Sequence, residues 1–118
     1  MTNEYGEQLD SNGYAPSIIP ENRQGKCYIC FKQGDLVRHE PFNGANRSKS
    51  QNLGLWVTLC PFCHRMCHQY PKTYGESMKR EMQSIAMQKY GWSRDDWHRI
   101  WGKSYLLEFA RNTAQTGA

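Results

Sequence analysis

The pattern of hydrophobic and polar positions divides the chain into segments of different character. Residues 1–25 mix glycine, proline and polar side chains with little periodicity, which predicts a flexible polar tail on which only the pair Ile18–Ile19 is suited to docking. Leu36–His39 predicts a short strand, and residues 53–59 predict a second strand because β-forming side chains dominate there. The Gly/Asn/Ser-rich stretch over residues 42–50 predicts a loop between them.

Beyond residue 60 the hydrophobic spacing becomes helical. A helix is predicted from His64 to Tyr70, because Pro61 is tolerated where a helix begins and Pro71 ends one. Residues 73–110 predict a helical extension packed on the core, and residues 111–118 have the composition of a disordered tail. The helical signals are the repeat Met78, Met82, Ile85 and Ala86, the stop at Gly91, the capping box Ser93–Asp96, and the stripe Trp97, Ile100 and Trp101.

Composition and charge narrow the class of protein. Hydrophobic residues make up 38% of 118 residues, which supports only a modest core. The net charge is +4, and residues 1–20 carry three acids and no base, so the remaining chain is distinctly basic and suits a nucleic-acid partner. No stretch approaches the roughly 20 apolar residues of a membrane span, and the acidic start is unlike a signal peptide. These features predict a cytoplasmic protein with reduced thiols.

Two cysteine pairs give the strongest chemical signal. Cys27-x2-Cys30 and Cys60-x2-Cys63 are separated by 29 residues. Each such turn aims two sulfurs at one point, and four thiolates complete the shell of a structural Zn²⁺ at about 2.3 Å. Such an ion supplies on the order of 10 kcal/mol to folding. The fifth cysteine, Cys67, is interpreted as a thiol facing the core, with exchange into the zinc shell as the alternative.

Three histidines are interleaved with the cysteine framework. His64 and His68 are four residues apart, so one face of a helix can present both imidazoles, and His39 ends the facing strand. Together they predict a second, catalytic metal site with open positions for water and phosphate oxygens. The alternative is that each histidine packs or caps locally. His98 has no partner at metal-binding spacing and is expected to be structural or exposed.

The order of these residues resembles the HNH endonuclease family. The resemblance is carried by Cys27-x2-Cys30, His39-Glu40, Asn52 and Cys60-x2-Cys63-His64, and the stretches 39–64 and 101–106 are similar to small phage-encoded members. It spans residues 26–106. It implies a small α+β fold in which a treble-clef ββα-metal zinc domain occupies residues 26–72 and is followed by C-terminal helices.

The resemblance also implies roles for individual residues. His39 takes the place of a metal ligand, His64 closes the metal site, and His68 adds a third ligand. Glu40 stands where the family usually has its base histidine, so either Glu40 is the general base, or His39 is the base and Glu40 the ligand, or activity has been lost. Asn52 takes the place of the asparagine that orients the base, with Asn43 and Asn46 as competitors.

The function that follows is metal-dependent hydrolysis of DNA phosphodiester bonds, by nicking or cutting, with Mg²⁺, Mn²⁺, Ni²⁺ or Zn²⁺ as the catalytic ion. The resemblance suggests phage DNA packaging or recombination proteins as partners. Phosphate contacts are assigned to Arg38, Arg47, Lys49 and Arg65. The competing hypothesis is a non-catalytic zinc finger that binds nucleic acid or protein. Convergence of the histidines beside a cleft, apart from the thiolates, discriminates between the two.

Overall fold

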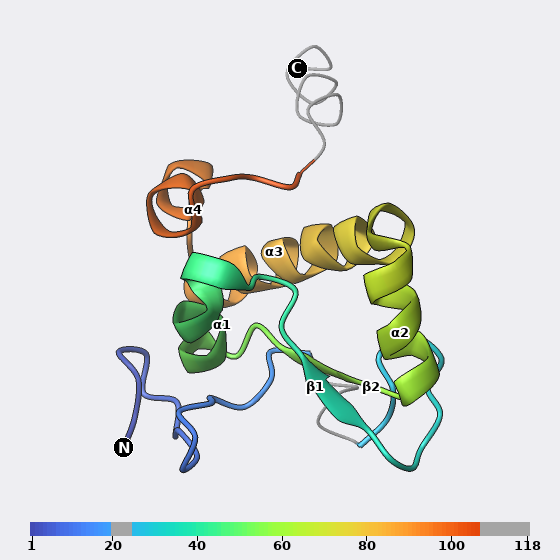
Figure 1. Ribbon diagram of the computed structural model, residues 1–118. Coiled ribbons are helices and arrows are strands. Elements are labelled where there is room, and N and C mark those ends of the chain that lie inside the picture. The colour runs from blue at the N-terminus through green and yellow to red at the C-terminus, as the bar shows by residue number, and fades with distance from the viewer. Residues whose placement is uncertain (20–24, 107–118) are drawn as a thin grey trace.

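The computed structural model describes residues 1–19 and 25–106, and the predicted disordered tail (residues 111–118) lies outside them. The fold is a small α+β arrangement, as predicted (Figure 1). No helix in the described part of the chain is long and apolar enough to span a bilayer. The elements are β1 (Val37–His39), the 3-10 turn η2 (Gly44–Asn46), α1 (Arg47–Leu53), β2 (Val57–Leu59), α2 (Pro61–Gln69), the π-helical turn η3 (Pro71–Gly75), α3 (Glu76–Tyr90) and α4 (Arg94–Trp101).

The two strands form an antiparallel ribbon. Val37 lies opposite Leu59, and His39 lies opposite Val57. Val57 and Leu59 are buried, so β2 turns one face to the core while His39 is held near the end of the ribbon beside α2. The strand predicted over residues 53–59 is therefore too long at its start.

Helix α1 corrects the prediction of a loop over residues 42–50. Ser50 and Leu53, three residues apart, are buried, and the remaining polar side chains of the helix face outward or lie at its edge. The hydroxyl of Ser50 donates to the carbonyl of Leu55 at 2.5 Å, which satisfies the polar group inside the core. Burial of one face therefore outweighs the turn-forming tendency of the Gly/Asn/Ser composition.

The later helices begin and end for local reasons. The Cys60 sulfur accepts from the backbone N–H of Cys63 at 3.4 Å and caps α2, which starts at Pro61. Helix α3 ends at Gly91, whose φ of 71° is left-handed. The predicted capping box of α4 is confirmed, because Ser93 and Asp96 each accept from the other's backbone N–H.

An aromatic cluster joins the C-terminal helices to the core. Trp97 is fully buried, and its ring stacks on Trp101 with centroids 5.1 Å apart. Phe42, just after β1, packs against both tryptophans. The buried side chain of Gln83 in α3 holds the segment after α4, since it donates to the Ser104 hydroxyl at 3.0 Å and accepts from the backbone N–H of residue 105 at 2.7 Å. In the predicted stripe, Trp97 and Trp101 are buried in the core, as expected, and Ile100 is partly buried against it.

The N-terminal segment (residues 1–19) packs on the domain and is not the flexible tail predicted for residues 1–25. In Figure 1 it runs in blue below α1. Ile18 and Ile19 are buried, the indole of Trp56 donates to the carbonyl of Ala15 at 2.7 Å, and the hydroxyl of Ser17 donates to the carbonyl of Trp56 at 2.6 Å. These partners are far away in sequence, so local composition gave no sign of them. Residues 20–24 lie outside the described residues.

Candidate metal centres

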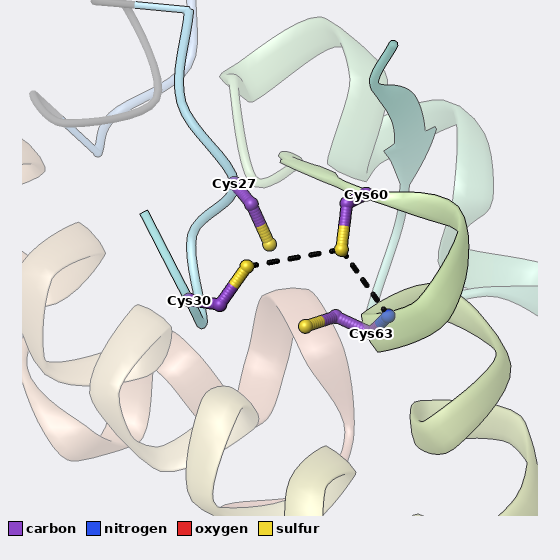
Figure 2. A group of neighbouring side chains, drawn as sticks. All are labelled: Cys27, Cys30, Cys60 and Cys63. Carbon is purple, nitrogen blue, oxygen red and sulfur yellow. Dashed lines mark hydrogen bonds between the residues drawn. The ribbon is translucent and has the colours of Figure 1, made fainter. Parts of the chain in front are cut away.

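The four predicted zinc ligands converge on one point (Figure 2). Cys27 and Cys30 come from the turn before β1, and Cys60 and Cys63 come from the junction of β2 and α2. All four sulfurs lie within 4.8 Å of one another, and the Cys30 and Cys60 sulfurs are 3.8 Å apart. Ligands about 2.3 Å from a tetrahedral Zn²⁺ are themselves about 3.8 Å apart. The group is close enough to hold a metal ion and is consistent with a structural zinc site.

Backbone hydrogen bonds define the first cysteine turn independently of a metal. The N–H of Phe31 donates to the Cys27 carbonyl at 2.8 Å, and the N–H of Cys27 donates to the Lys32 carbonyl at 2.9 Å. Phe31 takes a left-handed φ of 64°, which reverses the chain. The N–H of Tyr28 donates to the Thr58 carbonyl at 2.9 Å, so the turn is anchored to β2 next to the second cysteine pair.

The electrostatics of the sulfurs favour a bound cation. Burial opposes ionisation of Cys27, but backbone hydrogen bonds from Cys30, Cys60 and Ile29 outweigh it and lower its pKa to about 6. Burial and the neighbouring sulfurs raise the pKa of Cys63, which a positive ion at the centre would reverse. Cys67 is buried outside this group, and burial raises its pKa, as expected for a thiol that faces the core.

The three predicted histidines form a second group. His39 closes β1, and His64 and His68 project from α2. One ring nitrogen from each lies within 4.8 Å of the others, and the Nε2 atoms of His64 and His68 are 3.1 Å apart. Nitrogens about 2.0–2.1 Å from a tetrahedral ion are separated by about 3.4 Å. The imidazoles therefore have the spacing of a ligand set.

The surroundings favour the neutral form of His39 and His64. Burial lowers the pKa of His39 to about 4, and the nearby positive charges of His64, His68 and Lys79 act in the same direction, while the charge of Glu40 opposes them. Burial and the charge of His68 also lower the pKa of His64. Neutral imidazole is the form that binds metal or accepts a proton.

A cleft of about 370 Å³ opens beside the histidines. Its lining includes His39, Asn43 and His68, together with Lys72 of η3 and Lys79 of α3. Imidazoles, two lysines and the carboxylate of Glu76 therefore line the same cleft.

The asparagine assigned from the family pattern lies elsewhere. Asn52 lines a separate cavity of about 590 Å³ that also borders α4, and its carbonyl accepts from the Asn3 side chain at 2.8 Å. Asn46 donates to the Trp101 carbonyl at 3.1 Å. Asn43 is the one of the three that lines the cleft with His39. Asn52 lies on α1, which places it in the lining of this second cavity and not in the lining of the cleft beside His39.

Glu40 is held by the N-terminal segment and α1. Its Oε1 atom accepts from the Tyr14 hydroxyl at 2.5 Å and from the Gln51 amide at 2.9 Å, and Arg47 lies 3.7 Å away. Burial opposes ionisation, but these donors outweigh it and lower the pKa of Glu40. A lowered pKa makes this carboxylate a weaker base.

The four basic residues predicted to grip phosphate differ in their surroundings. Arg38 pairs with Asp10 at 3.0 Å and lies over the Tyr14 ring, and Lys49 donates to the Ile100 carbonyl. Arg47 and Arg65 are exposed, with Arg65 on the same helix as His64. Lys72 and Lys79 were missed, because nothing in their local sequence distinguishes them from ordinary surface lysines. Only the packing of η3 against both α2 and α3 brings them to the histidines.

No protein-family model, curated protein or solved structure matches this chain. The features of the molecule that bear on its function are therefore the cysteine group, the histidine group and the cleft.

Proposed function

We propose that this protein is a metal-dependent DNA endonuclease of the HNH type. The observation that carries the proposal is the second ligand group: His39, His64 and His68 bring their ring nitrogens within 4.8 Å of one another, separately from the four thiolates. A purely structural zinc domain needs the cysteines alone. Three converging imidazoles beside a cleft are a ligand set suited to hydrolytic chemistry.

The arrangement of elements supports a treble-clef interpretation. A cysteine turn precedes the β1–β2 ribbon, and the second cysteine pair straddles the start of α2. His64 follows Cys63 directly, so the helix that begins at the second cysteine pair also supplies two imidazoles. In this scheme the structural zinc fixes the orientation of α2, and α2 with β1 fixes the spacing of the histidines.

The residues around the cleft divide the chemistry between them. A divalent ion held by these nitrogens would act as a Lewis acid on a phosphate oxygen and make a nearby water more acidic. His64 and His68, with Nε2 atoms 3.1 Å apart, are the pair best placed to hold it. His39 is neutral at physiological pH and serves either as the third ligand or as the acceptor of the water's proton. Asn43 lines the same cleft and supplies an amide to orient that imidazole.

A plasmid-nicking assay tests the proposal. Zinc-loaded wild-type protein is expected to relax supercoiled DNA with at least one of Mg²⁺, Mn²⁺, Ni²⁺ or Zn²⁺. His39→Ala and His64→Ala should each lower the rate by on the order of 10²-fold, as loss of a ligand or base does. His98→Ala is the matched control, because His98 is an exposed histidine on α4, and it should cleave like the wild type.

Measurement of the second metal then assigns His39. If His39 is a ligand, its alanine variant binds the catalytic ion more weakly; if it is the base, binding is unchanged and only turnover falls. Intact supercoiled plasmid under every metal would contradict the nuclease proposal. Retained DNA binding in that case would support the non-catalytic zinc module.

A further inference from the structure

Two lysines contribute to the lining of the cleft beside the histidines. Lys72 lies in η3 and Lys79 lies in α3, and both line the cleft with His39 and His68. Lys79 is partly buried, so its position is more restricted than that of a free surface lysine. Its ammonium lies 5.0 Å from the centre of the Tyr105 ring, which steadies it further.

Both lysines keep their charge available. Among residues 1–19 and 25–106, the ion pairs of the molecule involve neither Lys72 nor Lys79. Glu76 lines the same cleft, but its carboxylate lies 3.9 Å from Arg80 on the same helix. Lys79 is also close enough to His39 for its charge to act on that imidazole. Two unpaired cations thus face a cleft that ends at a candidate catalytic centre.

We propose that Lys72 and Lys79 bind consecutive phosphates of a DNA strand lying in this cleft, and so present one phosphodiester to His39, His64 and His68. The inference rests on the proposed nuclease function and assigns its phosphate-binding residues to η3 and α3. A lysine ammonium acts as a compact point charge toward phosphate, and such contacts fix the register of a strand without reading its sequence. The site therefore recognises the DNA backbone and not particular bases.

Salt dependence of binding gives a quantitative test. Each phosphate neutralised by a lysine releases condensed counterions and contributes roughly 0.9 to the slope of log affinity against log salt for duplex DNA. Lys72→Gln and Lys79→Gln should each flatten the slope by about 0.9, and the double variant by about 1.8. Lys79→Arg keeps the charge and should retain the slope.

The experiment measures anisotropy of a fluorescent DNA duplex with zinc-loaded protein and no further divalent ion, over a series of salt concentrations. Lys89→Gln is the matched control: Lys89 is also on α3, but its ammonium is 2.9 Å from Glu7, so the same net charge is removed without removing an available cation. Its slope should match the wild type. Circular dichroism and zinc content establish that every variant is folded.

Two assays separate this inference from the proposed function. Flattened slopes in the glutamine variants, with the control unchanged, support the lysine site whether or not the wild type nicks plasmid. An active wild type whose glutamine variants keep the full slope and the full cleavage rate would overturn the lysine site and leave the nuclease proposal standing. Equal flattening in Lys89→Gln would also overturn it, because overall charge would then explain the effect.

Discussion

At the scale of single residues, the candidate centre depends on the state of its imidazoles. His39 is partly buried and surrounded by two further histidines and Lys79, so a proton on its ring is disfavoured by lost hydration and by nearby positive charge. Glu40 is its sequence neighbour, yet the Tyr14 hydroxyl and the Gln51 amide hold that carboxylate. The two adjacent side chains thus have different surroundings: His39 lies among imidazoles, and Glu40 is held by hydrogen-bond donors.

We expect His39 to titrate near pH 4 when the histidine group is free of metal, well below the ordinary value of 6.5. Its protonation therefore favours the unfolded chain. The corresponding stability is fully present above about pH 6.5 and is lost as the pH falls toward 4. NMR of the ring protons in zinc-loaded protein measures the titration, and urea unfolding across this interval measures the loss.

His39→Ala serves both measurements. It identifies the His39 resonance, and it should remove part of the stability change between pH 6.5 and 4. A ring that titrates near 6.5 would mean that His39 is open to solvent and distant from His64 and His68.

At the scale of elements, one glycine joins α1 to the N-terminal segment. Gly54 ends α1 with a left-handed φ of 81°, and a Cβ at this position would lie 2.3 Å from the Pro16 carbonyl oxygen. The N–H of Ile18 donates to the Gly54 carbonyl at 3.0 Å. The turn and the docked segment therefore depend on the same residue.

Gly54→Ala should destabilise the fold by about 2 kcal/mol or more, because the left-handed conformation costs roughly 1–2 kcal/mol and the clash with Pro16 adds to it. Gly91→Ala is the matched control, since Gly91 has a similar φ of 71° but open space around it. It should lose only about 1 kcal/mol. Equal losses in urea unfolding would show that the N-terminal segment does not pack against Gly54.

At the scale of the whole molecule, the parts predictable from sequence are those set by short-range chemistry. The cysteine spacing, the limits of α2 set by Pro61 and Pro71, and the capping box of α4 depend on neighbours a few residues away. The convergence of His39 with α2 was also predictable. The sequence indicates both the strand that ends at His39 and the helix that carries His64 and His68.

Contacts between segments that are far apart in the sequence could not be predicted from it. The N-terminal segment docks through partners such as Trp56, and α1 forms because the core buries Ser50 and Leu53. That helix places Asn52 in the lining of a separate cavity, while α3 places Lys79 in the lining of the cleft beside the histidines. Local composition contains neither set of contacts, since each depends on how separate elements pack.

The group of four cysteines links two parts of the fold and is consistent with a structural zinc site. It joins the turn before β1 to the start of α2, and a bound structural Zn²⁺ is worth on the order of 10 kcal/mol, comparable to the entire stability of a small domain. Purified protein should therefore carry close to one tightly held zinc, measured by elemental analysis. Cys63→Ser should lose this ion and unfold, or melt far below the wild type.

Cys67→Ala separates loss of zinc from loss of a buried thiol. Cys67 and Cys63 are both buried in α2, but only Cys63 belongs to the group of four sulfurs. The Cys67 variant should keep its zinc and lose only the modest stability expected of a small cavity. If the wild type stays folded in excess chelator with no metal bound, the sulfurs do not organise α2. The spacing of His64 and His68 against His39 would then depend on the hydrophobic core alone.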